Sequence, residues 1–330
     1  MKYECLKIKF ILFLVFWILA LFTNVLYSQN EPLYTQFLNN HITTNPAYTG
    51  TRNTLAVDLT TRKQWFGVDN SPTTQLLTLH APINKTRVSL GGAISTDWVG
   101  LERVSQALFS YSYLVRINVG MFLSLGLNAG VNNYHFNYSG IKLIDLGDQF
   151  FEAKRADEFK PLVGVGAILF TRKFRICLSA PQVLTDNLLG NESGIFAQAT
   201  AHYYASADYN FVFNKKNVMR LSTFSRIPVH GPFMTDYCAL YDYKNMLGLG
   251  FVYRSNSTMA SILNFQVNKN IEVCYSYDFP LKNNGSFKQG SHELTLKYDI
   301  YKFYRRNKYR IFNKKKTEEE PQTLRSIRYF

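Results

Sequence analysis

The sequence predicts an all-β protein: a transmembrane antiparallel β-barrel of about 14 strands, of the outer-membrane type. Three observations lead to this fold class. Many segments alternate between apolar and polar residues, these segments are long, and the connections between them follow a regular order of short and long. Aromatic residues make up 15% of the chain and cluster near several segment ends, as in the interfacial girdles of such barrels.

Residues 119–132, VGMFLSLGLNAGVN, show the alternation most clearly. One side carries Met121, Leu123, Leu125, Leu127, Ala129 and Val131; the other carries Phe122, Ser124, Gly126, Asn128, Gly130 and Asn132. A period of two marks a strand with one apolar face. In a membrane barrel the first side faces lipid and the second faces the interior. We expect an interior lined mostly by Ser, Gly, Asn and Thr, with few charges.

Strand length separates this barrel from a soluble sandwich. Strands in soluble folds usually run about five or six residues, whereas a tilted bilayer crossing takes ~9–11. The expected strands are residues 54–65, 73–82, 86–97, 103–117, 119–134, 160–171, 173–180, 198–213, 217–228, 233–243, 246–255, 258–268, 270–279 and 291–303. All but 173–180 reach the length of a crossing.

The connections alternate in length. Every second one is short: PINK, RI, RK, NKKN, YKN and NK. Most of the others are longer: FGVDNSP, DWVGLE, residues 135–159, PQVLTDNLLGNES and LKNNGSFKQG; two, near 229–232 and 254–257, are brief. Outer-membrane barrels have short periplasmic turns, long outer loops and an even strand count. We therefore expect a barrel in the bacterial outer membrane with both termini in the periplasm.

The segments outside the barrel divide the chain further. Lys2, Lys7 and Lys9 precede an apolar run, residues 10–22, which predicts a signal peptide over 1–28. An uncleaved anchor is the alternative, although the run is shorter than the ~20 residues of a spanning helix. Residues 29–53 are expected to dock in the lumen or on the periplasmic rim, or to be a disordered leader. The barrel takes 54–303, and 304–330 is a basic periplasmic tail, either solvated or a docking element.

Composition argues against several functions. The net charge is +14, concentrated in the C-terminal tail, and export argues against a nucleic-acid partner. Cys177, Cys238 and Cys274 remain after signal cleavage, an odd number with no metal-binding spacing. No HExxH, GxSxG or phosphate-binding loop is present. The adjacent residues 291–293, Ser-His-Glu, point to opposite faces of a strand and cannot form a triad among themselves. We expect no enzyme activity, no catalytic residues, no cofactor and no metal.

The chain resembles the PorP/SprF family of outer-membrane proteins of the type IX secretion system in Bacteroidetes. The resemblance rests on QFLNNHITTNPAYTG, RKQWFGVDNSPTTQLLTLHAPI, FKPLVGVGAILFTRKFRICLSAPQVL, HYYASADYNF, LGLGFVYRS, YSYDF and GSHELTLKY. The residues that it marks, as structural or partner-docking positions, are Asn45, Pro46, Ala47, Tyr48, Gly50, Gln64, Trp65, Gly67, Pro72, His80, Pro82, Gly290, Ser291, His292 and Glu293. A lysine-rich run at 314–316 followed by three Glu departs from the pattern.

The resemblance implies a 14-stranded barrel that acts in secretion or surface attachment of large adhesins, or in gliding motility. It also implies partners: other secretion components in the periplasm and outer membrane, secreted adhesin cargo, and outer-membrane lipid. Two other functions stay open. A passive porin or solute channel would need a charged constriction, and an exported β-sandwich lectin would wash off membranes.

Overall fold

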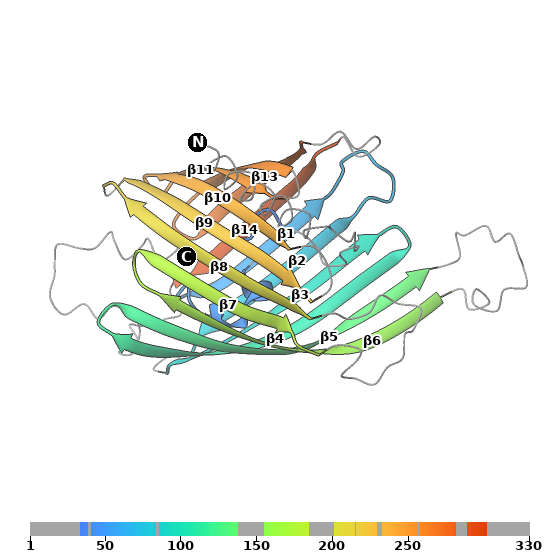
Figure 1. Ribbon diagram of the computed structural model, residues 1–330, viewed down its shortest axis with the longest axis horizontal. Helices are drawn as coiled ribbons and strands as arrows, with labels where there is room; N and C mark the ends of the chain where they lie inside the picture. Colours follow the sequence, from blue (N-terminus) through green and yellow to red (C-terminus); the bar gives the residue numbers. More distant parts are fainter. Residues whose placement is uncertain are drawn as a thin grey trace, which may run out of the picture.

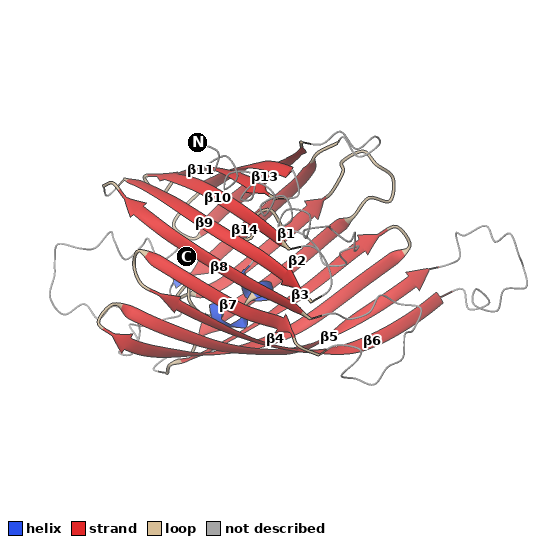
Figure 2. Ribbon diagram, viewed as in Figure 1, coloured by secondary structure: helices blue, strands red, loops and turns tan. Residues whose placement is uncertain are grey.

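The computed structural model describes residues 34–38, 41–83, 86–137, 155–184, 201–214, 216–229, 233–255, 258–281 and 289–301. The expected signal peptide and basic tail lie outside these residues. The chain forms a closed antiparallel barrel of 14 strands (Figure 1), which confirms the predicted fold class. Two short helices lie within the outline of the barrel (Figure 2). Among the described residues, no helix is long and apolar enough to cross a membrane.

Two short helices precede the first strand, and the 14 strands then follow one another around the barrel in chain order. The elements are α2 (His41–Thr44), the 3-10 helix η1 (Pro46–Tyr48), β1 (Leu55–Lys63), β2 (Thr73–Pro82), β3 (Val88–Val99), β4 (Glu102–Asn118), β5 (Met121–Asn137), β6 (Arg155–Phe170), β7 (Phe174–Gln182), β8 (His202–Val212), β9 (Asn217–Pro228), β10 (Met234–Tyr243), β11 (Leu247–Arg254), β12 (Thr258–Gln266), β13 (Ile271–Pro280) and β14 (Ser291–Ile300). Most bounds lie within a few residues of the prediction.

Closure depends on the pairing of the first strand with the last. β1 and β14 pair antiparallel from Leu55 opposite Ile300 to Lys63 opposite His292. An open sheet edge in hydrocarbon would leave backbone groups unpaired at a cost of several kcal/mol each. The β1–β14 pairing removes that edge, and it places Arg62 directly opposite Glu293.

The two sides of β5 face the environments that the alternation predicts. Leu125 and Leu127 are 45% and 55% exposed on the outer surface, whereas Ser124 and Asn128 are 2% and 3% exposed. Phe122 also points inward, where its ring stacks on that of Phe170. The lipid-facing surface is therefore apolar while the interior combines polar groups with a few packed rings.

The barrel has two unlike ends. At one, which we call the short-turn end, the connections are residues 83–87, 119–120, 171–173, 213–216, 244–246 and 267–270, each five residues or fewer. At the other, the long-loop end, they include 64–72, 138–154, 183–201 and 281–290. β1 begins and β14 finishes at the short-turn end.

One expected loop at the long-loop end is wrong. DWVGLE was expected as a connection, but β3 continues to Val99 and β4 begins at Glu102, leaving a two-residue turn. Gly100 takes a φ of +61°, which such a tight turn requires and which glycine adopts without strain. β4 and β5 each have 17 residues and β6 has 16. These strands exceed a bilayer crossing, so polar residues near their ends lie in strand rather than loop.

The expectation of few interior charges is also wrong. Many buried side chains inside the barrel are ionisable: Arg52, Asp58, Arg62, Lys160, Arg175, Asp208, Arg220, Arg226, Asp236, Asp242, Arg254, Glu272, Asp278, Glu293, Lys297 and Asp299. Most lie within 4 Å of an opposite charge on a neighbouring strand or on the N-terminal segment. Segment 119–132 carries none of them. Apart from Phe122, its inward residues are small, and at Ser124 and Gly126 another part of the chain packs against them.

Candidate functional site

The lumen contains the chain's own N-terminal residues. Residues 34–38 and 41–53 precede β1, and their side chains are mostly buried against the inward faces of the strands. We call residues 41–53 the lumen base and residues 34–38 the lumen segment. The base packs near the short-turn end, where η1 contacts β4, β5 and β6. The segment contacts wall residues nearer the long-loop end.

The lumen base begins with a capped turn. The Asn45 Oδ1 atom accepts a hydrogen bond of 2.9 Å from the Ala47 backbone N–H, and Pro46 occupies the first position of η1. Both features are typical of a helix start. The Asn45 side-chain amide also donates to the carbonyls of Ala167 and Leu178. The Asn-Pro-Ala-Tyr motif thus forms a turn and fastens it to β6 and β7.

Serines of the wall bind the backbone of the lumen base. Ser124 Oγ donates to the Ala47 carbonyl at 2.7 Å, and Ser112 Oγ donates to the Thr49 carbonyl at 2.7 Å. A Cβ atom at Gly126 would lie 2.1 Å from the Ala47 nitrogen. Small inward residues on β4 and β5 therefore provide both the hydrogen bonds and the space that η1 needs.

The motif residues Gly50, His80 and Tyr48 meet on the β2 side of the base. Gly50 has a φ of +73°, and its N–H donates to His80 Nδ1 at 3.1 Å. A Cβ at Gly50 would lie 2.2 Å from Ser89 Oγ. The Tyr48 ring packs edge-on against the His80 imidazole. Pro82 ends β2 opposite Ser89, so these motif positions share one packing site.

Ion pairs hold the base from two further directions. Arg52 bonds Asp58 at 2.6 Å and Asp299 at 3.0 Å, which ties the chain to β1 and β14. Arg175 bonds Asp208 at 2.6 Å and lies 3.0 Å from His41 Nε2. Burial, followed by the charge of Arg175, lowers the pKa of His41 well below its usual value. The His41 ring is therefore neutral, and its Nε2 accepts a hydrogen bond from the guanidinium.

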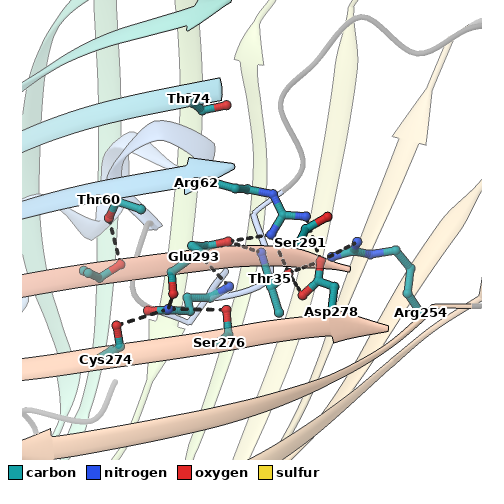
Figure 3. A network of polar contacts seen from close by, with 12 residues as sticks. Thr35, Thr60, Arg62, Thr74, Arg254, Cys274, Ser276, Asp278, Ser291 and Glu293 are labelled. Atoms are coloured by element: carbon teal, nitrogen blue, oxygen red, sulfur yellow. Dashed lines mark hydrogen bonds and ion pairs between the residues drawn. The ribbon is translucent and has the colours of Figure 1, made fainter. Parts of the chain in front are cut away.

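The lumen segment is held through its main chain by Glu293. One carboxylate oxygen accepts the Thr35 backbone N–H at 2.8 Å, and the other accepts the Gln36 N–H at 3.1 Å. The Gln36 side-chain amide donates to the Glu293 carbonyl at 3.0 Å. Figure 3 shows Thr35 and Glu293 facing each other between the strands. This motif glutamate therefore binds another part of the chain rather than a neighbouring serine or histidine.

An ion cluster surrounds the same contact (Figure 3). The Arg62 guanidinium bonds Asp278 at 2.7 Å and Glu293 at 3.0 Å. It also donates to the Thr35 hydroxyl at 2.9 Å, which in turn donates to Asp278. Arg254 lies 3.9 Å from Asp278 and bonds Asp236 at 3.0 Å. All these side chains are nearly inaccessible to solvent, so their charges are balanced by one another.

The last two residues of the lumen segment occupy an apolar pocket. The Phe37 ring stacks on Phe224 with centroids 5.2 Å apart, and Phe224 stacks on Tyr204. Phe37 and Leu38 belong to one buried cluster with Tyr204, Phe224, Cys238, Leu240, Val252, Ala260 and Ile262. Beneath the segment, a cavity of about 10 Å³ lies between Gln36 and Lys297, room for about one water molecule.

The remaining motif residues form a rim at the long-loop end. The Phe66 N–H donates to the Gly290 carbonyl at 2.9 Å, and the Trp65 N–H donates to Ser291 Oγ at 3.3 Å. Phe66 packs edge-on against His292 with centroids 5.0 Å apart. We call this contact between the 64–72 and 290–292 stretches the loop-end rim. It joins two motifs that lie far apart in the sequence.

Glycine and proline shape the loop-end rim. Gly67 has a φ of +92°, and a Cβ there would lie 2.3 Å from Gln289 Oε1. The Gln64 N–H donates to the Pro72 carbonyl at 2.9 Å, which closes the β1–β2 loop. His292 of the rim also contacts β13, since its Nδ1 lies 2.7 Å from the Tyr275 hydroxyl. The residues marked by the resemblance thus divide between the lumen base, the rim and the Glu293 contact.

Several residues of the site were missed by the sequence analysis: Thr35, Gln36, Phe37, Arg62, Arg254 and Asp278. Arg62 and Asp278 had a detectable signal, since each is a charged residue at an inward position of an alternating strand. A charge at such a position requires a partner. The sequence analysis allows residues 29–53 to dock in the lumen, but nothing in the sequence pairs Thr35 with Arg62 and Asp278.

Cys177, Cys238 and Cys274 are free and buried. Within the described part of the chain, no group of three or more His, Cys, Asp or Glu side chains could hold a metal ion.

Fold and lumen together define an outer-membrane β-barrel with an occupied interior. The family model described as "Type IX secretion system membrane protein PorP/SprF" matches residues 26–298. The chain belongs to this family, as the resemblance predicts. Membership implies association with components of the secretion system.

The comparison with solved structures gives outer-membrane barrels at low identity. The KdgM porin is 12% identical with a TM-score of 0.37, covering 75% of this chain and 100% of its own. Omp33 of Acinetobacter baumannii is 9% identical with a TM-score of 0.43, covering 75% and 98%. The CymD monoaromatic hydrocarbon channel is 12% identical with a TM-score of 0.47, covering 81% and 93%. No curated protein matches the chain.

Proposed function

We propose that this barrel is a non-enzymatic component of the type IX secretion system that supports secretion or surface attachment of large adhesins, and through them gliding motility. Family membership over residues 26–298 carries the proposal. The short-turn end faces the periplasm in this proposal, as in other barrels with short turns on that side. Partners on the outer side of the membrane then bind the loop-end rim. Partners in the periplasm bind the basic tail, 304–330.

The occupied lumen favours this function over a passive porin. A porin needs a continuous aqueous path through the barrel. Here the lumen base binds β4 and β5 through serine hydroxyls, while the lumen segment binds β13 and β14. The interior charges form pairs with one another. Such an interior serves as a polar core, and a component that holds partners requires no open channel.

Deleting the gene tests the proposal. We expect one or more large surface adhesins to disappear from the surface proteome measured by mass spectrometry, and surface motility to fall. Complementation with the intact gene is the control and should restore both. An unchanged surface proteome together with normal motility would contradict the proposed role.

A second strain tests whether the tail acts in partner binding or in barrel insertion. A chain that lacks residues 305–330 should insert normally, shown by carbonate-resistant membrane association and heat-modifiable gel mobility. Capture of secretion partners in a cross-linking pull-down should weaken. If the truncated chain fails to insert, the tail acts in barrel assembly and the docking assignment is wrong.

A further inference from the structure

The wall around the lumen segment has the composition of a peptide-binding site. Glu293 accepts two successive backbone N–H groups, from Thr35 and Gln36. Backbone N–H donors are present in every peptide other than at proline. This half of the site therefore binds a peptide backbone that turns two successive N–H groups toward the carboxylate. It does not depend on most side chains of the peptide.

The other half of the site selects side chains. Phe37 stacks on Phe224, and Leu38 belongs to the same buried cluster. The Thr35 hydroxyl lies between Arg62 and Asp278; it accepts a hydrogen bond from the Arg62 guanidinium and donates one to the Asp278 carboxylate. Each side chain of residues 35–38 thus contacts a wall group of matching chemistry. In order, these side chains are a small hydroxyl, an amide, an aromatic ring and an aliphatic group.

The site excludes additional charge. Arg62 and Arg254 lie opposite Asp278 and Glu293, Arg254 also bonds Asp236 at 3.0 Å, and Arg226 bonds Asp236 at 2.9 Å, so three positive groups face three negative ones. An extra charge buried here would lack a partner and would be strongly unfavourable. A ligand for this wall is therefore uncharged where it contacts the cluster.

The lumen base does not depend on these contacts. Its bonds run to Ser112, Ser124 and His80 on β4, β5 and β2, and Arg52 bonds Asp299 at the short-turn end of β14; none of them involves Asp278 or Glu293, which hold Thr35 and Gln36. The base can therefore remain in place while the segment leaves the wall. This separation makes exchange of the segment possible without unfolding the barrel.

We propose that the inner wall formed by Arg62, Asp278, Glu293 and the Phe224 cluster is a peptide-binding site, occupied in this structure by the chain's own residues 35–38. Its ligand class is an uncharged peptide with the order hydroxyl, amide, aromatic and aliphatic. A segment of a partner protein with this chemistry replaces the lumen segment. The proposal is independent of the adhesin role.

Direct binding tests the site. A mature chain that starts at residue 39 is refolded in detergent, and its folding is checked by heat-modifiable gel mobility. A fluorescein-labelled synthetic peptide of residues 33–40 is then titrated with this barrel, and fluorescence anisotropy is measured. We expect saturable binding to the shortened barrel and much weaker binding to the intact barrel, whose site is occupied.

A matched peptide with Phe37→Ala is the control. Its affinity should fall about tenfold or more, because losing a buried phenylalanine ring costs more than the ~1.4 kcal/mol of a tenfold change. Absence of binding to the folded shortened barrel, or equal affinity of the two peptides, would overturn the proposal. If the shortened chain does not fold, the intact chain with Phe37→Ala and Leu38→Ala replaces it. That variant should bind the wild-type peptide, and failure to bind would overturn the proposal equally.

Discussion

Arg62→Met should lower the stability of the barrel by about 3–5 kcal/mol, the usual cost of removing one partner from a buried ion pair. Asp278 and Glu293 would remain buried at 3% and 0% exposure without the guanidinium that lies between them. Thr35 would also lose a hydrogen-bond donor. The measurement is urea unfolding of the refolded protein in detergent, followed by tryptophan fluorescence.

Two variants serve as controls for the Arg62 prediction. Arg116→Met removes an exposed arginine near the short-turn end and should leave the unfolding midpoint unchanged. The triple variant Arg62→Met, Asp278→Asn, Glu293→Gln removes the unpaired charges and should recover part of the loss, since neutral replacement of a buried ion cluster is far less costly than breaking it. If Arg62→Met unfolds at the wild-type midpoint, the ion cluster does not stabilise the barrel.

Gly126→Val should produce the second large effect. A Cβ at this position would lie 2.1 Å from the Ala47 nitrogen and 2.4 Å from the Pro46 carbonyl carbon, both backbone atoms of η1. Overpacking of a fitted interior costs about 1–3 kcal/mol, occasionally more. We expect the temperature at which the folded gel band converts to the unfolded band to fall.

Ala129→Val provides the matched control on the same strand. Ala129 lies on the outward, exposed side of β5, three positions away, where added methyl groups meet lipid. Its transition temperature should equal that of the wild type. Equal transition temperatures for Gly126→Val and Ala129→Val would show that η1 does not lie against β5.

The strands were predictable because lipid and lumen impose opposite requirements on alternate residues. In β5 the period of two identifies Leu125 and Leu127 as outward and Ser124 and Asn128 as inward, as the structure shows. The same period of two, followed along the chain, gave the 14 segments that the barrel contains as strands. The predicted strand bounds were wrong where strands extend beyond the bilayer, as in the expected DWVGLE connection. There, polar residues such as Glu102 are compatible with a strand in water, so composition no longer separates strand from loop.

The interior was less predictable because it depends on register and on distant contacts. Arg62 and Glu293 lie 231 residues apart and meet only when β1 pairs with β14. The contact of Thr35 with Asp278 spans 243 residues. Local patterns contain no record of such pairs. The family resemblance marks Gly50 and Gly67, but the neighbours that a Cβ at these positions would meet, Ser89 and Gln289, become known only from the structure.

The central claim is that the chain's own N-terminal residues fill the lumen of a closed barrel. Single-channel recording of the intact, purified protein in planar lipid bilayers tests it most directly. The structure predicts no steady conductance, because residues 34–38 and 41–53 occupy the path that ions would take. A stable, ohmic conductance of porin size from the intact chain would contradict the claim.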